Sequence, residues 1–251
     1  DQLFHLSQMS INTINTINPI NQINLHNLQN PQQHFQQPVS GNNIRINLMG
    51  ITGSGKSTSA ELISDYAIAK GYKALIVSAD KWSKTGMTGK NLAKKVSSEI
   101  EKFNACIGDK VIIVDLCNEN GVPDKCFNSD LSSYKSHKFT PNFNKDTDNF
   151  NDYECWCLNN VLSRGQHNNT TNYWLNPVSA GVNTCIKVHN AKARGIKNTL
   201  GLSAYPKSFT ETLTMNEIMN TITDGAFRYR TKLATSNLKD DIVSFLTFIN
   251  L

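Results

Sequence analysis

Long apolar runs are missing from this sequence, and so is the cysteine spacing of a structural metal site. No run of about 18 apolar residues occurs, so we expect no transmembrane helix. None of the six cysteines pairs at the Cys-x-x-Cys spacing that a zinc site usually needs. We interpret all six as free thiols, which indicates an intracellular, reducing compartment, either cytoplasmic or nuclear.

The start of the sequence lacks an initiator methionine and the charged and then apolar layout of a signal peptide. We therefore expect a piece of a longer, multidomain chain. Acidic residues are slightly fewer than basic ones, and the formal net charge is +5. This small excess permits a polyanionic ligand such as a nucleotide or RNA without requiring one.

Asparagine and glutamine dominate residues 1–43, where Ile-Asn recurs at every third position between Ile11 and Asn24. This period matches neither a strand nor a helix. Such a tract buries too little apolar surface to offset its loss of conformational entropy, and we predict that it is disordered. It is either a tether or assembly segment or a product of compositional drift. Residues 44–251 are predicted to form one domain.

Strands and helices alternate through that domain. Apolar runs predict strands at 44–49, 73–79 and 111–116. Apolar residues at helical spacing predict helices at 57–70, around 92–103, at 151–164 and at 177–193. Weaker patterns predict a short strand at 138–143, a short helix at 215–223 and an ordered terminal segment at 238–248. The alternation is typical of an α/β fold with a parallel sheet sandwiched by helices.

A glycine-rich motif follows the first predicted strand and opens the first predicted helix. Residues 50–58 read Gly-Ile-Thr-Gly-Ser-Gly-Lys-Ser-Thr and match the P-loop pattern G-x-x-x-x-G-K-[ST]. Its glycines let backbone N–H groups face phosphates, and the helix N-terminus adds positive potential. We expect Lys56 to reach the β and γ phosphates of a nucleoside triphosphate, and Ser57 to bind magnesium. The predicted nucleotide-binding residues are Gly50, Thr52, Gly53, Ser54, Gly55, Lys56, Ser57 and Thr58.

Three further residues have the chemistry that phosphoryl transfer needs. Asp115 ends the third strand, where a carboxylate would support the magnesium ion, although an Asp there can also cap a turn. Asp80 follows the second strand and is either the base for an incoming hydroxyl or a cap. Arg164 ends a helix that could close over the γ phosphate as a lid, or it is a surface arginine. His189 lacks a partner at a metal spacing and is interpreted as structural or solvated.

These features together resemble the kinase branch of P-loop proteins, and within it the kinase domain of fungal-type tRNA ligases. The similarity covers roughly residues 44–194, with matching blocks at 49–58, 111–118 and 156–168. The D-x-x-G motif of GTPases is absent after the third strand, and N-K-x-D is absent from the chain. Neither the K-x-D-G motif of nucleotidyl transfer nor a pair of H-x-[ST] motifs occurs, so ligation is not expected of this chain.

The resemblance implies a P-loop kinase, with magnesium as cofactor, that transfers the γ phosphate of ATP or GTP to the 5′-hydroxyl of RNA, as in RNA repair and tRNA splicing. A helical lid is part of that expectation. Lys56, Asp80 and Arg164 would be the catalytic residues, and Ser57 and Asp115 would hold the metal. Two alternatives stay open, namely a small-molecule kinase acting on a nucleoside or an adenylylsulfate-like acceptor, and a nucleotide-binding module without catalysis.

Overall fold

A computed structural model describes residues 42–78, 89–116, 131–164, 177–202, 213–235 and 237–251. All of them belong to one compact unit, Pro38–Leu251. Asp80 and residues 1–41 lie outside the described ranges, so the predicted base and the predicted disordered tail both stay predictions. In the described part of the chain, no helix combines the length and the apolar character that crossing a membrane requires.

The sheet contains four parallel strands in the order β2-β3-β1-β4, which confirms the predicted α/β class. These strands are β1 (Asn43–Leu48), β2 (Lys73–Ser78), β3 (Lys110–Asp115) and β4 (Lys135–Phe139). The fourth strand was predicted too late in the chain, at 138–143. It ends before Pro141, because proline has no N–H to donate to a strand ladder.

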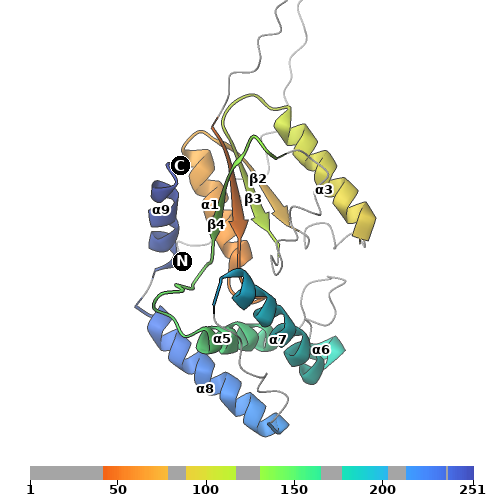
Figure 1. Ribbon diagram of the computed structural model, residues 1–251, viewed down its shortest axis with the longest axis vertical. Helices are drawn as coiled ribbons and strands as arrows, with labels where there is room; N and C mark the ends of the chain where they lie inside the picture. The colour runs from red at the N-terminus through yellow and green to blue at the C-terminus, as the bar shows by residue number, and fades with distance from the viewer. Residues whose placement is uncertain (1–41, 79–88, 117–130, 165–176, 203–212, 236) are drawn as a thin grey trace, which may run out of the picture. The chain divides into compact units, whose positions relative to one another are not determined.

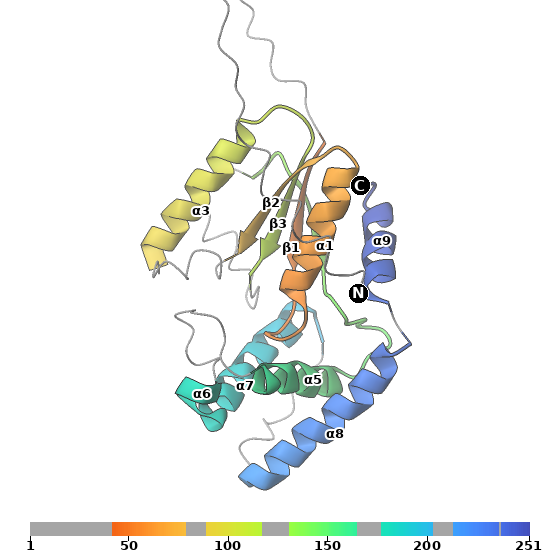
Figure 2. The ribbon, with the colours of Figure 1, turned by 180° about the vertical axis from the view of Figure 1, so that it is seen from behind.

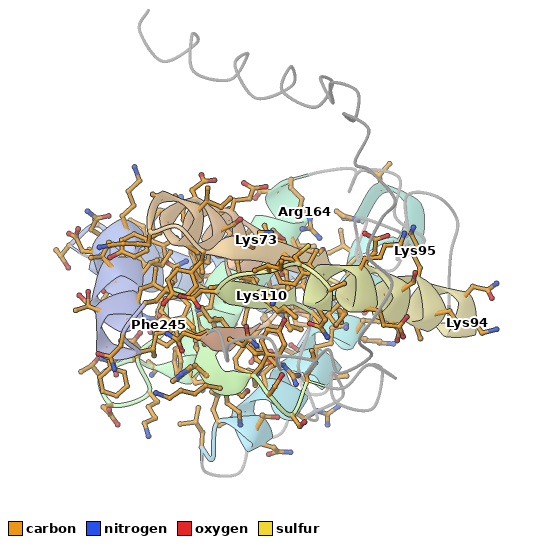
Figure 3. All side chains as sticks on the ribbon, turned by 90° about the horizontal axis from the view of Figure 1, so that it is seen from above. Lys73, Lys94, Lys95, Lys110, Arg164 and Phe245 are labelled. Carbon is orange, nitrogen blue, oxygen red and sulfur yellow. The ribbon has the colours of Figure 1, made fainter. Side chains whose placement is uncertain are left out.

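Helices cover both faces of the sheet (Figures 1 and 2). Helices α1 (Lys56–Ala69) and α9 (Leu238–Phe248) pack on one face. Helix α3 (Gly89–Asn104) packs on the other through Val96 and Ile100. Figure 3 shows Phe245 of α9 at one side of the sheet and Lys94 and Lys95 of α3 projecting outward at the other. The sheet is therefore sandwiched as predicted, with the basic side of α3 turned to solvent.

The remaining helices lie beyond the carboxyl ends of the strands, where a lid was expected (Figures 1 and 2). They are α5 (Phe150–Ser163), α6 (Pro177–Ala180), α7 (Val182–Thr199) and α8 (Met215–Leu233). The single helix predicted at 177–193 is divided at Gly181, whose φ of 81° is incompatible with an α-helix.

Helix α8 is longer than the predicted 215–223. It begins at a capping box in which Thr214 and Glu217 satisfy each other's backbone N–H groups. Its length follows from packing along α5, because Gly225 lets the two helices approach closely. A Cβ at Gly225 would lie 2.7 Å from the Cβ of Cys155. Gly225 therefore weakens the helix pattern in the sequence, but the contact between α5 and α8 requires it.

Candidate nucleotide-binding site

The glycine-rich loop connects β1 to α1 at the carboxyl edge of the sheet. Gly53 and Gly55 have φ values of 89° and 92°, which side chains with a Cβ rarely adopt. The close approach of α5 also requires glycine, because a Cβ at Gly53 would lie 2.3 Å from the carbonyl oxygen of Cys157. Helix α5 is therefore seated directly against the loop.

Lys56 curls back over the loop instead of extending into solvent. Its Nζ donates hydrogen bonds to the carbonyl oxygens of Gly50, at 3.0 Å, and Ile51, at 2.9 Å. Only 8% of the residue is exposed. A lysine ammonium has three N–H donors, so the geometry leaves one of them for an anion held by the loop.

Three side chains from outside the loop bind its next three carbonyl oxygens. His189 Nε2 lies 3.2 Å from the oxygen of Thr52. Asn160 Nδ2 donates to the oxygen of Gly53, at 3.0 Å, and Asn142 Nδ2 donates to the oxygen of Ser54, also at 3.0 Å. In a trans peptide unit the N–H points opposite to the C=O. The N–H groups of Gly53 and Gly55 therefore point away from the side chains, as in backbone nests that bind anions. The N–H of Ser54 instead donates a hydrogen bond of 3.2 Å to the carbonyl oxygen of Ile51 within the loop.

Ser57 and Asp115 meet where β3 ends and α1 begins. The hydroxyl of Ser57 donates a hydrogen bond of 2.8 Å to Oδ2 of Asp115. Ser57 is exposed, whereas Asp115 has 8% exposure. Both groups offer oxygen, the donor atom that magnesium prefers, and kinase sites complete the coordination with phosphate oxygens and water. The pair fits that use because it offers two oxygen ligands and leaves the rest to phosphate and water. Among the described residues, no cluster of three or more His, Cys, Asp or Glu could hold a metal.

The other predicted site residues lie around this centre or outside the described ranges. Ser54 is a fully buried residue of the loop, while Thr58 is exposed on the first turn of α1. Arg164 is the exposed C-cap of α5, and its charge contributes to lowering the pKa of His189. Asp80 lies outside the described ranges, and β2 ends at Ser78, which pairs with Asp115 of β3. Strand β2 therefore ends at the same edge of the sheet as β3, and β3 lies between β2 and β1.

Sequence analysis missed the amides of Asn142 and Asn160, and it underestimated His189. His189 is fully buried, and burial, helped by nearby positive charges, lowers its pKa to about 3. Of the two alternatives given for His189, structural or solvated, this burial supports the structural one. No local pattern could have identified these residues, because they act on the loop from positions 88, 107 and 137 residues away.

Glu154 is an unusual neighbour of the site, on the face of α5 toward α7. The residue is fully buried, and neither carboxylate oxygen has a hydrogen-bond partner within the described part of the chain. Burial raises the pKa of this carboxyl to about 8, and the charges of Lys197 and Arg194 only partly oppose the shift. The folded protein therefore holds a proton that the unfolded chain releases.

Because of this bound proton, we expect the free energy of unfolding to depend on pH. Between pH 4.5 and about 8 the native state binds more protons at Glu154 than the unfolded state does. The stabilisation is complete below pH 4.5 and is lost as the pH rises to about 8, by at most about 1.4 kcal/mol per pH unit. We expect Glu154→Gln and Glu154→Leu to flatten this dependence, measured by urea unfolding at several pH values. Curves parallel to the wild type would contradict the shifted pKa.

Comparisons with known proteins give few relatives. No family model matches the sequence. The chain is 29% identical over 185 residues to the uncharacterized protein L611 of Acanthamoeba polyphaga mimivirus, a match that covers 69% of this chain and 19% of that protein. This chain thus spans about a fifth of the relative's length. A gluconokinase from Sinorhizobium meliloti 1021 is similar in structure, with a TM-score of 0.31 and 15% identity, over 78% of this chain and 99% of the other. A likeness this distant is no guide to substrate.

Proposed function

We propose that the chain is a magnesium-dependent P-loop kinase that transfers the γ phosphate of ATP or GTP to a hydroxyl, namely the 5′-hydroxyl of RNA. The observation that carries the proposal is the contact between Ser57 and Asp115 at the mouth of the glycine-rich loop. A hydroxyl and a carboxylate from two different elements meet where a metal on the phosphates would lie. A glycine turn without a nucleotide would have no need of this pair.

Each residue then has a definite role. The loop N–H groups and the remaining N–H of Lys56 bind the phosphate oxygens and oppose the charge that develops during transfer. Ser57 and Asp115 would hold the magnesium ion, which would neutralise phosphate charge. Asp80 accepts the proton of the attacking hydroxyl, and Arg164, at the end of the helix seated on the loop, binds oxygens of the γ phosphate.

The RNA acceptor rests on the resemblance to the kinase domain of tRNA ligases and on the net positive charge of the chain. The same resemblance suggests a role in RNA repair or tRNA splicing inside the cell. Residues 1–43 are proposed to be a disordered extension of the kinase domain, which comprises residues 44–251.

The test is phosphate transfer from labelled ATP and GTP to a panel of nucleosides and oligonucleotides. We expect label on RNA with a 5′-hydroxyl end and none on the same RNA with a 5′-phosphate. RNA binding should weaken as salt rises, because lysine and arginine contacts release counterions, with a slope of about −0.7 in log K per phosphate contact. Label on nucleosides alone, with little salt dependence, would instead identify a small-molecule kinase. Nucleotide binding without any labelled acceptor would indicate a non-catalytic module.

A further inference from the structure

The glycine-rich loop has a weakness that follows from its own composition. Glycine at positions 50, 53 and 55 lets the backbone adopt positive φ, and the same freedom lets individual peptide units rotate. If the peptide between Thr52 and Gly53 rotated, its carbonyl oxygen would replace its N–H at the phosphate site. An oxygen dipole facing phosphate is repulsive, so contacts from outside the loop that hold its carbonyls favour phosphate binding. The peptide between Gly53 and Ser54 is also held from within, because its N–H donates to the carbonyl oxygen of Ile51.

We propose that His189, together with Asn160 and Asn142, forms a carbonyl clamp that holds the loop ready for phosphate. The clamp consists of the three side chains that bind the oxygens of Thr52, Gly53 and Ser54. The three residues come from α7, from α5 and from the segment after β4. They do not touch the nucleotide in this proposal, and they are therefore positioning residues. The inference rests on the proposed nucleotide site and adds the residues that set its geometry.

His189 is the most restricted member of the clamp, because its imidazole ring can carry its proton in only one position. The ring is fully buried, and the charges of Lys56, Lys192 and Arg164 all disfavour a second proton. A neutral imidazole donates through one nitrogen. Because Nε2 faces the carbonyl oxygen of Thr52, the proton must be on Nε2. Nδ1 is buried without a hydrogen-bond partner among the described residues, so the ring is committed to the loop contact.

Asn160 adds a second contact between the clamp and the loop. Its amide binds Gly53, the residue whose missing Cβ admits the backbone of α5. Helix α5 thus contacts the same peptide unit twice, once by packing and once by hydrogen bonding. Asn142 performs the equivalent function at Ser54, and its own carbonyl accepts a hydrogen bond from Tyr229 of α8 at 2.5 Å. Each clamp residue is held by a separate part of the fold.

The experiment measures binding of magnesium with ATP and with GTP, by titration calorimetry, for His189→Leu and His189→Gln. Leucine fills a similar space without a donor, whereas the glutamine amide can donate from about the position of Nε2. We expect His189→Leu to weaken affinity about tenfold, the value of one hydrogen bond, and His189→Gln to recover most of that loss. Asn198→Ala, an exposed change on the same helix, should bind like the wild type.

Three outcomes would overturn the carbonyl clamp. If leucine and glutamine lower affinity and melting temperature equally, His189 serves packing alone and the clamp is wrong. If His189→Leu binds as the wild type does, the clamp is also wrong. If His189→Leu does not fold, Asn160→Ala replaces it, because that side chain is only half-buried, and unchanged affinity in Asn160→Ala overturns the inference. Failure of the wild type to bind any nucleotide would instead refute the proposed function.

Discussion

Replacing Lys56 by alanine is expected to lower phosphoryl transfer by at least about 10²-fold, because the change removes a preorganised positive charge from the developing negative charge of the transferred group. The structure adds a second effect. The ammonium group also binds the carbonyl oxygens of Gly50 and Ile51, so its loss releases the first part of the loop. Nucleotide affinity should therefore fall together with turnover, and single-turnover transfer and titration calorimetry measure the two quantities.

Lys56→Met is the matched control, because methionine keeps most of the apolar stem and lacks the charge. Alanine and methionine should lose transfer to a similar extent if the ammonium is responsible. The Lys56 side chain is buried, so a small loss of melting temperature is expected in both variants. If Lys56→Ala kept more than about a tenth of the wild-type activity, against the loss expected for such a donor, the nucleotide site would be elsewhere.

Asp80→Asn is expected to lower turnover by about 10² to 10⁴-fold, because asparagine keeps the shape of the side chain but cannot accept a proton. Affinity for the nucleoside triphosphate should hardly change, since the loop contacts are untouched. The measurement is kcat with a 5′-hydroxyl RNA acceptor and nucleotide affinity on the same preparation. A general base predicts this combination, and a residue that only caps a turn does not.

The cap alternative has its own signature. Asparagine caps helices and turns about as well as aspartate, so stability would change by about 1 kcal/mol or less and turnover would stay intact. That result would remove Asp80 from the site and make Asp115 the candidate base. Asp115→Asn is the useful companion, because a change at the Ser57 pair should raise the magnesium concentration needed for half-maximal activity. Asp80→Asn should leave that concentration unchanged.

Most of the sheet and the helices on its faces could be predicted from the sequence, because their signals are local. The apolar run at 111–116, and Gly71, which follows the end of the helix predicted at 57–70, can each be recognised from residues a few positions apart. The phosphate loop is local in the same sense, since its glycines, Lys56 and Ser57 are consecutive. The fourth strand and α8 were harder, because β4 contains only one apolar residue, Phe139, and α8 packs against α5 beyond its local pattern.

The sequence by itself determined the α/β class, the glycine-rich loop and the carboxylate at the end of β3. Only the tertiary structure decided that Ser57 and Asp115 touch, that Lys56 is buried, and that His189, Asn160 and Asn142 bind the loop. It also decided that Glu154 is buried with no hydrogen-bond partner for its carboxylate among the residues that the structure describes. The physical reason is the distance along the chain over which each interaction acts. Backbone propensity and hydrophobic period act over one or two turns, whereas hydrogen bonds and burial depend on which distant segments the folded core brings together.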